Sequence, residues 1–246
     1  DFLNYIKAVE AAQGSALSNT AKARIFTVFS RLKAEIDYSK IAALYLAEGS
    51  NANAKKINAK SPGTKDLIFS STGIDYASSG ITFDGVNGSA DTQVQTLNTA
   101  QPRAFCSASI ISLGATNPGI SVSFYNNPPR FYLVTSATTA AYSNYAASER
   151  TISFSSKTSG TFCINRFSDS EHTFSVDGSL SDTATAAVES SPTLQGNIVV
   201  GAFSLNNVLS DFKAAQYSSL ILGDQGLTTA EIASLHSIQD QHRWAR

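Results

Sequence analysis

The spacing of apolar residues changes about a quarter of the way along this chain of 246 residues. In the first part, apolar side chains recur every three or four positions, which is the period of an amphipathic helix. This spacing predicts a helix over residues 1–13, a second helix that begins after an N-cap at Ser18, and a short third helix over Ser39–Ala47. A polar stretch over residues 49–66 predicts a loop that leads from the helices into the rest of the chain.

After this loop the apolar period is two, as expected for strands that bury one face. Ile152 and Phe154, separated by a serine, are one example. Turn residues follow at short intervals without helical crossovers, so we predict a mainly β fold, an antiparallel two-sheet jelly-roll sandwich. A Ser-, Thr- and Ala-rich stretch over residues 179–196 predicts a surface loop. The predicted strands are Asp66–Phe69, Ile81–Phe83, Ala104–Leu113, Ile120–Tyr125, Arg130–Val134, Arg150–Ser155, Thr161–Phe167, His172–Val176, Asn197–Ala202 and Tyr217–Leu222.

The chain returns to a helical pattern near its end. Thr228 and Glu231 have the spacing of a capping box, in which two side chains satisfy backbone N–H groups at the start of a helix. This predicts a closing helix over residues 227–243. We expect Trp244, the single tryptophan, to anchor that helix to the sheet.

Length and composition fit this organisation. The chain is long enough for a helical lead and linker over residues 1–60 and a sandwich with its closing helix over residues 61–246. Charged residues make up only 15% of the sequence, below the usual roughly 25%, which is typical of many secreted, virion and glycan-facing β-proteins. The net charge of -1 offers no basic field for nucleic acid. No apolar run reaches the roughly 20 residues of a membrane span, so membrane insertion is not expected.

The two cysteines and three histidines do not form a recognisable metal-binding or catalytic motif. Cys106 and Cys163 lie in separate apolar runs, so buried free thiols are the favoured interpretation and an inter-strand disulfide is the alternative. Neither has a histidine or a second cysteine at metal-ligand spacing. His172 is expected at a surface or strand edge, and neither it nor His236 or His242 belongs to a nucleophile elbow.

A glycosidase would need two carboxylates on either side of the scissile bond, about 5–9.5 Å apart. The nearest pair in the sequence is Asp169 and Glu171, which falls in a predicted turn. We therefore expect no catalytic residues and no enzyme activity.

One glycine-rich loop offers several oxygen donors in a short stretch. Within Gly80–Thr92, glycines permit sharp turns while Asp84, Asn87 and Asp91 supply carboxylate and amide oxygens. Capping of the turns by these side chains is the favoured interpretation. A calcium site is the alternative, although calcium prefers six or more oxygens and only three donor residues are found here. No other cofactor is expected.

Exposed aromatic rings beside amides would suit a glycan at a loop edge or on a concave face. Several Tyr and Asn residues near strand ends have this composition, although strand alternation predicts that some of the tyrosines pack in the core or at its rim instead. The candidate carbohydrate-binding residues are Tyr125, Asn126, Asn127, Tyr142, Asn144 and Tyr145.

Three motifs carry a family resemblance. They are Phe83-Asp-Gly-x-Asn-Gly-x-Ala-Asp-Thr92, His172-Thr-Phe-Ser-Val-Asp-Gly178 and Gly223-Asp-Gln-Gly-Leu-Thr-Thr-x-Glu231. The first two resemble concanavalin A-like and laminin-G-like jelly rolls. All three, in this order after a helical lead, resemble a module of virion structural proteins in tailed phages and prophages. The sequence departs from that pattern at Ser89, where a glycine is expected.

The resemblance implies a phage virion structural protein on the tail, fibre or capsid surface. It implies other virion proteins and copies of the same chain as partners, with the jelly roll facing outward toward host-surface glycan. It supplies no catalytic site. The first alternative is a secreted, extracellular lectin-like carbohydrate-binding module, and a less favoured one is a polysaccharide hydrolase.

Overall fold

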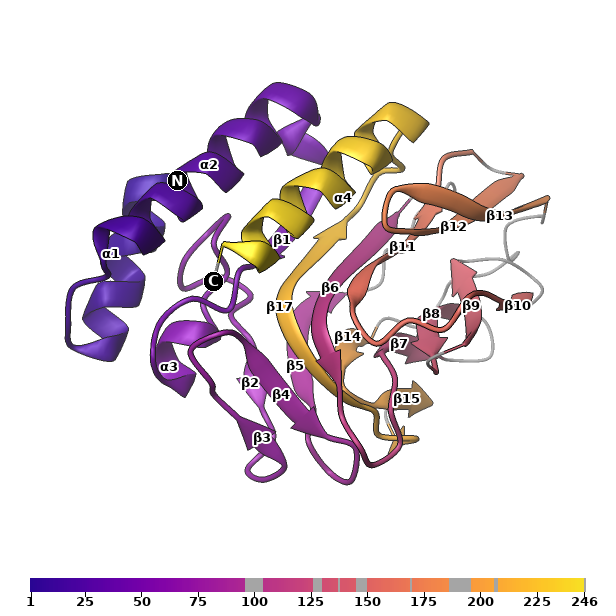
Figure 1. The fold of residues 1–246 in the computed structure, drawn as a ribbon, viewed down its shortest axis with the longest axis horizontal. Coiled ribbons are helices and arrows are strands. Elements are labelled where there is room, and N and C mark those ends of the chain that lie inside the picture. Colours follow the sequence, from indigo (N-terminus) through magenta and orange to yellow (C-terminus); the bar gives the residue numbers. More distant parts are fainter. Residues whose placement is uncertain are drawn as a thin grey trace.

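The computed structural model shows two facing β-sheets with a layer of helices against one of them (Figure 1). It describes residues 1–246 apart from 96–103, 126–129, 137, 145–149, 169, 186–195, 206–207 and 246. The antiparallel sandwich, the N-terminal helices and the C-terminal helix confirm the predicted fold class.

Sheet A is built around one long strand, β17 (Ala214–Gly223). One side of β17 pairs with β6, and the other side pairs first with β4 and then with β1, always antiparallel. The order across the sheet is β13-β12-β11-β6-β17-β4-β3, with β1 beside the second half of β17. These strands are β1 (Ile41–Tyr45), β3 (Ile74–Asp75), β4 (Ile81–Asp84), β6 (Phe105–Leu113), β11 (Gly160–Arg166), β12 (Glu171–Val176) and β13 (Ser179–Thr185).

Sheet B faces sheet A and has the order β10-β9-β8-β7-β14-β5-β2. After β14 the chain forms a hairpin of β15 (Phe203–Leu205) and β16 (Val208–Ser210). This hairpin lies on the face of sheet B that is turned away from sheet A, where the Phe203 ring meets Tyr132 edge-on at 5.6 Å between centroids. The remaining strands are β2 (Ile68–Phe69), β5 (Ala90–Gln95), β7 (Ser121–Tyr125), β8 (Arg130–Thr135), β9 (Thr139–Asn144), β10 (Arg150–Ser153) and β14 (Asn197–Val200).

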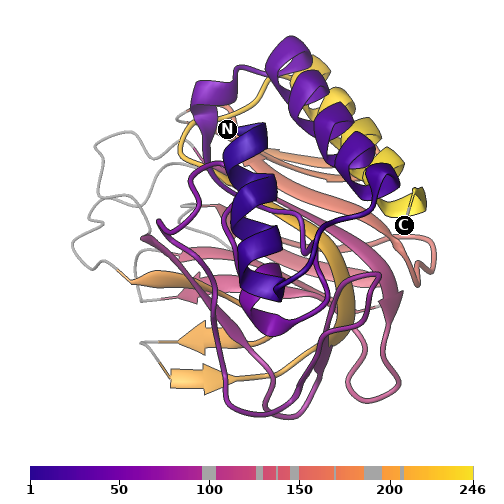
Figure 2. The same ribbon diagram turned by 90° about the vertical axis from the view of Figure 1, so that its left-hand side faces the viewer.

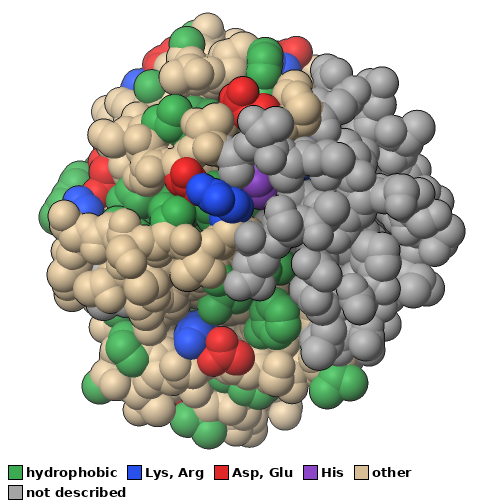
Figure 3. Space-filling model, turned by 90° about the vertical axis from the view of Figure 1, so that its right-hand side faces the viewer, with side chains coloured by type: hydrophobic (Ala, Val, Ile, Leu, Met, Phe, Trp, Pro, Cys, Tyr) green, Lys and Arg blue, Asp and Glu red, His purple; other side chains and the backbone are tan. Residues whose placement is uncertain are grey.

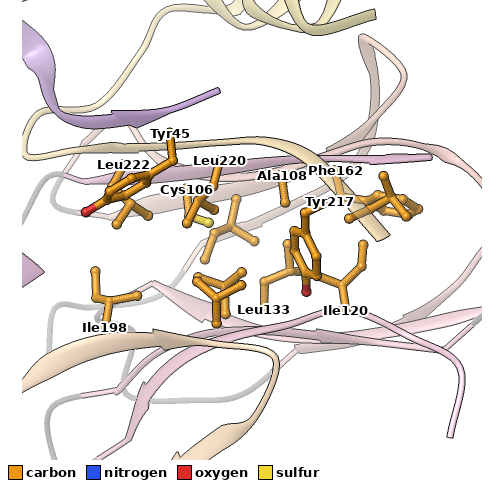
Figure 4. Close-up of a cluster of buried hydrophobic side chains, with 14 of the residues drawn as sticks. Tyr45, Cys106, Ala108, Ile120, Leu133, Phe162, Ile198, Tyr217, Leu220 and Leu222 are labelled. Carbon is orange, nitrogen blue, oxygen red and sulfur yellow. The ribbon is translucent and has the colours of Figure 1, made fainter. Parts of the chain in front are cut away.

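Alternate residues of the facing strands build the core between the sheets (Figure 4). Sheet A contributes Phe162, Leu220 and Leu222, and sheet B contributes Leu133 and Ile198. Each side chain of this size contributes roughly 1.5–3 kcal/mol when it is removed from water.

Helices cover the other face of sheet A, and α2 and α4 run side by side there (Figures 1 and 2). Side chains of sheet A that alternate away from the first core, such as Phe105 and Ile221, form a second core with Leu32 of α2 and Leu235 of α4. None of the described helices has the length and apolar character that crossing a bilayer requires. The helices are α1 (Phe2–Gln13), α2 (Asn19–Glu35), α3 (Ala52–Lys55) and α4 (Thr229–Trp244).

The first two predicted helices and the capping box of α4 are confirmed, but the third predicted helix is wrong. A short 3-10 turn over Tyr38–Lys40 leads directly into strand β1. Leu44 of this strand packs in the helix-side core and Tyr45 packs between the sheets. A strand buried on both faces shows no alternation, and its apolar spacing imitates that of a helix. The structure thus places a strand of sheet A within the first 60 residues.

Two other expectations are also wrong. The first part of the stretch predicted as a surface loop over residues 179–196 is β13, whose polar composition reflects its place at the edge of sheet A. Residues 186–195 of that stretch lie outside the described residues. Trp244 does not anchor α4 to the sheet, because it is 74% exposed and lies beside the Arg243 guanidinium. Leu235 and Ile238 hold the helix in place instead.

The two cysteines lie on opposite faces of sheet A. Cys106 faces sheet B, whereas Cys163 on the neighbouring β11 faces the helices, and each lies across from a different residue of the other strand. The buried free-thiol interpretation is confirmed. Burial raises the pKa of the Cys163 thiol to about 12, so it stays protonated and unreactive.

A buried ionic network joins the N-terminal helices to α4. Glu48, which is 3% exposed, accepts hydrogen bonds from Arg24 Nε at 3.0 Å and Nη2 at 2.8 Å. Its Oε1 also lies 3.0 Å from Nε2 of His242, on α4. Because these groups have left water, their pairing favours one arrangement of α2, α4 and the chain after β1.

Replacing Glu48 by alanine should lower the free energy of unfolding by about 3–5 kcal/mol, because it removes a buried carboxylate that is shared by the buried His242 and the partly buried Arg24. Urea denaturation followed by circular dichroism measures the loss. The matched control is Glu35→Ala, since Glu35 pairs with Arg31 at 2.7 Å on the surface of α2. That control should cost at most about 1 kcal/mol, and equal losses in the two variants would contradict the role assigned to Glu48.

Candidate functional site

The structure gives the predicted carbohydrate-binding residues different surroundings. The Tyr142 ring is buried between the sheets, stacked on Phe174 at 5.5 Å, and its Oη donates a hydrogen bond to Asp182 Oδ2 at 2.9 Å. Tyr125 and Asn144 end β7 and β9 at the same end of sheet B. Asn126, Asn127 and Tyr145 lie outside the described residues.

The predicted calcium-binding residues occupy a turn and a strand. Asp84 Oδ1 accepts hydrogen bonds from the backbone N–H groups of Val86, Asn87 and Gly88 at 2.9–3.0 Å, which caps the turn after β4. Partial burial would raise the pKa of Asp84, but these backbone donors together hold it below its usual value. Asp91 lies on β5 and bonds within sheet B. Among the described residues, His, Cys, Asp and Glu form no cluster of three that could hold a metal ion.

His172 is not at a surface, contrary to the prediction. It alternates with Phe174 and faces the interior of the sandwich, where its ring lies 5.2 Å from that of Tyr142. Burial, with smaller contributions from Arg166 and Arg150, lowers the pKa of His172 to about 4. The imidazole is therefore neutral at pH 7.

A groove of about 390 Å³ opens on the face of sheet B that is turned away from sheet A. It runs between the edge strand β2 and the β15–β16 hairpin, over β5 and β14. We call this feature the sheet-B groove. The residues that line it are Ile68, Phe69, Ser70, Ser89, Asp91, Asn197, Val199, Ser204 and Leu209.

An acid and an amide are held together in the sheet-B groove. Asn197 Nδ2 donates a hydrogen bond to Asp91 Oδ2 at 2.9 Å, and Asp91 Oδ1 accepts one from the Gln93 backbone N–H at 2.7 Å. The strand pairing is irregular between Asn197 and Val199, and Gln93 has a positive φ of 55°. Such a bulge re-aims side chains, and here both polar groups face the groove.

The rest of the groove combines hydroxyls with apolar side chains. Ser70 Oγ accepts a hydrogen bond from the Ser89 N–H at 3.0 Å, which fixes the chain leaving β2. Ile68, which pairs with Asp91 and is 56% exposed, forms the wall on the side of β2. The Phe69 ring lies on the opposite face of β2, where it packs against Tyr76 and the core between the sheets. Leu209, 40% exposed, forms part of the opposite wall. The site therefore offers a fixed polar pair between apolar surfaces.

A second pocket of about 220 Å³ lies between α4 and the outer face of β11–β13. Ser175 in this pocket is 2.8 Å from His236 Nε2, a distance compatible with nucleophile activation. However, His236 Nδ1 has no hydrogen-bond partner in the described structure, so the group that orients a catalytic histidine is missing. The pocket is also smaller than the roughly 300–1,000 Å³ usual for ligand sites.

The sequence indicated only part of the sheet-B groove. Asp91 was noticed as an oxygen donor, but its partner Asn197 lies 106 positions later and at the end of a predicted strand. The sequence shows that Asp91 and Asn197 are polar residues in or beside strands. It does not show that these two strands pair, which is what brings the residues together.

Solved structures with a similar fold include sialidase from Trypanosoma rangeli. Its complex with 2,3-difluorosialic acid has a TM-score of 0.57 at 13% identity, over 89% of this chain and 39% of the sialidase. The binding domain of botulinum neurotoxin serotype G has a TM-score of 0.50 at 11% identity, over 81% of this chain and 51% of that domain. This chain thus spans well under two thirds of either protein.

These similarities agree with the two-sheet β-sandwich described above. At such low identity they concern the fold alone. No protein-family model matches the sequence, and no curated protein matches it.

The buried histidines predict a loss of stability in mild acid. Burial lowers the pKa of His236 to about 4, while an unfolded histidine titrates near 6.5. The unfolded state therefore takes up protons first, so stability is complete above about pH 6.5 and falls as the pH drops toward 4. Between pH 6.5 and 4.5 His236 alone should cost about 2 kcal/mol.

Urea unfolding at pH 7.0, 6.0, 5.0 and 4.5 tests this dependence. His236→Gln keeps a polar partner for Ser175 but does not titrate, so its free energy of unfolding should fall less steeply over this range. The same slope in both proteins would show that His236 is not responsible.

Proposed function

We propose that this chain is a lectin-like carbohydrate-binding module and that the sheet-B groove holds its glycan. The observation that carries the proposal is the Asp91–Asn197 pair, fixed at 2.9 Å on adjacent strands. This pair lies in a groove of about 390 Å³ that also presents Ile68, the residue across from Asp91 on β2. Sites for small ligands usually combine a small number of fixed polar groups with apolar walls.

A pyranose ring suits this arrangement chemically. Its hydroxyls can donate to the remaining lone pairs of Asp91 and accept the second amide hydrogen of Asn197. Its C–H face can pack on Ile68 and Leu209, which are otherwise 56% and 40% exposed to water. The volume of the groove lies within the range of known ligand sites, whereas that of the pocket beside α4 does not.

The comparisons support this proposal through the fold. The sialidase structures hold a sugar, sialic acid or its difluoro derivative, and the toxin fragment is a binding domain. Those ligands belong to those proteins, and this chain resembles only part of each. A module of this kind would act outside the cell or on a particle surface, where glycans are exposed.

We propose binding without catalysis. Asp91 is the one carboxylate among the described residues that line the groove, whereas a glycosidase generally needs two. The bound sugar would therefore be released unchanged.

A second candidate is the virion structural role that the sequence motifs imply, with the helices as an assembly surface. Leu3 on α1 and Phe26 on α2 are 62% and 56% exposed, although both are large apolar residues. Exposed apolar side chains of this kind suit contact with another virion protein or a copy of the chain. The sialidase and toxin structures give this candidate no support, so the lectin-like module is the proposal that we favour.

Removing either member of the polar pair should weaken glycan binding. A glycan array probed with the full chain identifies ligands, and calorimetric titration then compares Asp91→Ala and Asn197→Ala with the parent chain. Each variant should lose at least about tenfold in affinity, because hydrogen bonds to a charged group contribute roughly 1.5–3 kcal/mol.

The matched control for this titration is Asp224→Ala, which removes the same charge from an exposed position after β17. It should bind like the parent chain. The proposal is wrong if no glycan binds, or if the two groove variants bind as tightly as the control.

A further inference from the structure

We propose that the sheet-B groove selects neutral sugars with two adjacent free hydroxyls and rejects acidic sugars such as sialic or uronic acids. This inference rests on the carbohydrate-binding function proposed above and names the class of ligand. It follows from the hydrogen-bonding capacity of Asp91 and Asn197 and from the charges that line the groove.

The polar pair is matched to hydroxyl groups. The Asp91 carboxylate only accepts hydrogen bonds, and two of its lone-pair positions are already taken by Gln93 and Asn197. Asn197 has one amide hydrogen and its carbonyl oxygen left for a ligand. Neighbouring hydroxyls on one sugar ring can donate to the acid and accept from the amide at the same time, because each hydroxyl does both.

A carboxylate on the ligand would be mismatched at the same place. It only accepts hydrogen bonds, so next to Asp91 it would meet a second acceptor of the same charge. No lysine, arginine or histidine lines the groove in the described part of the chain, so no cation there would offset the repulsion. Two like charges about 6 Å apart weaken binding roughly threefold at the dielectric constant of water and roughly a hundredfold at the value of about 20 typical of a protein surface, so we expect about tenfold in this partly hydrated groove.

The remaining walls also disfavour an anion. On either side of the polar pair the groove presents Ile68 and Leu209, which are 56% and 40% exposed. A carboxylate turned away from Asp91 would lose water against these side chains without gaining a partner. The C–H face of a neutral pyranose has no strongly bound water to lose when it contacts these side chains.

The sparse charge of the chain as a whole supports the same conclusion. Only 15% of the residues are charged. Figure 3 shows one side of the molecule, where the coloured Lys, Arg, Asp and Glu side chains stand singly or in small groups among polar and apolar atoms. The net charge is -1, so the protein as a whole does not attract anions. This chain shares a fold with part of a sialidase that was solved with sialic acid. The described residues that line its own groove nevertheless include no basic side chain that could pair with such an acid.

Matched pairs of methyl glycosides test the inference directly. Methyl glucoside, galactoside and mannoside are each compared with the corresponding methyl uronide, which differs only in carrying a carboxylate at C6. The full chain, labelled with ¹⁵N, is titrated at pH 7 and about 50 mM salt, where charge repulsion is weakly screened, and the shifts of its backbone amide NMR signals are followed. For at least one pair, the neutral member should bind about tenfold more tightly than its uronide.

Two variants separate the charge from the shape of the groove. Asp91→Asn keeps an acceptor oxygen but removes the charge, so the preference for the neutral member should fall below about threefold. Asp224→Asn, the control away from the groove, should keep the full preference. Raising the salt to about 0.5 M should reduce the preference of the parent chain.

Each result bears on a definite claim. Equal or tighter binding of the uronides by the parent chain overturns the selectivity while leaving carbohydrate binding intact. An unchanged preference in Asp91→Asn shows that Asp91 does not cause the selectivity. If no member of any pair binds and the glycan array is also blank, the carbohydrate-binding function itself fails.

Discussion

The structure depends on sheet A being buried on both faces. Its central strand β17 sends Leu220 and Leu222 into the space between the sheets and Ile221 into the layer beneath the helices. One strand therefore belongs to two hydrophobic cores, and its pairing with β1, β4 and β6 connects them. Loss of this pairing would expose both cores, so the helices and the sandwich are expected to unfold together.

This two-sided burial leaves sheet B as the sheet that can carry a site. The helices and the buried Arg24–Glu48–His242 network occupy the outer face of sheet A, and what remains beside α4 is a small pocket. In the described part of the chain, the outer face of sheet B is covered only in part, by a short hairpin. A polar pair can remain partly hydrated on such a face, which is what a ligand site requires.

Local patterns were sufficient to predict most of this fold. Helix caps at Ser18 and Thr228 and the alternation in β10 and β12 each reflect a single element and its immediate surroundings. The errors arose where long-range packing decided the outcome. β1 is buried on both faces, and β13 is polar because it is an edge strand. β5 and β9 were not predicted, because alanine together with Asp91 in β5 and Asn144 in β9 lowers their β-propensity.

The candidate site was less predictable than the fold because it depends on register. Asp91 and Asn197 meet only because β5 and β14 pair with an irregularity that turns both side chains to one face. A slip of one residue would turn one of them into the hydrophobic core. The same dependence makes the site rigid, since hydrogen-bonded strands and a backbone donor from Gln93 hold the carboxylate before any ligand arrives. Little conformational entropy then has to be lost on binding, so a groove with few polar contacts can still discriminate between closely related sugars.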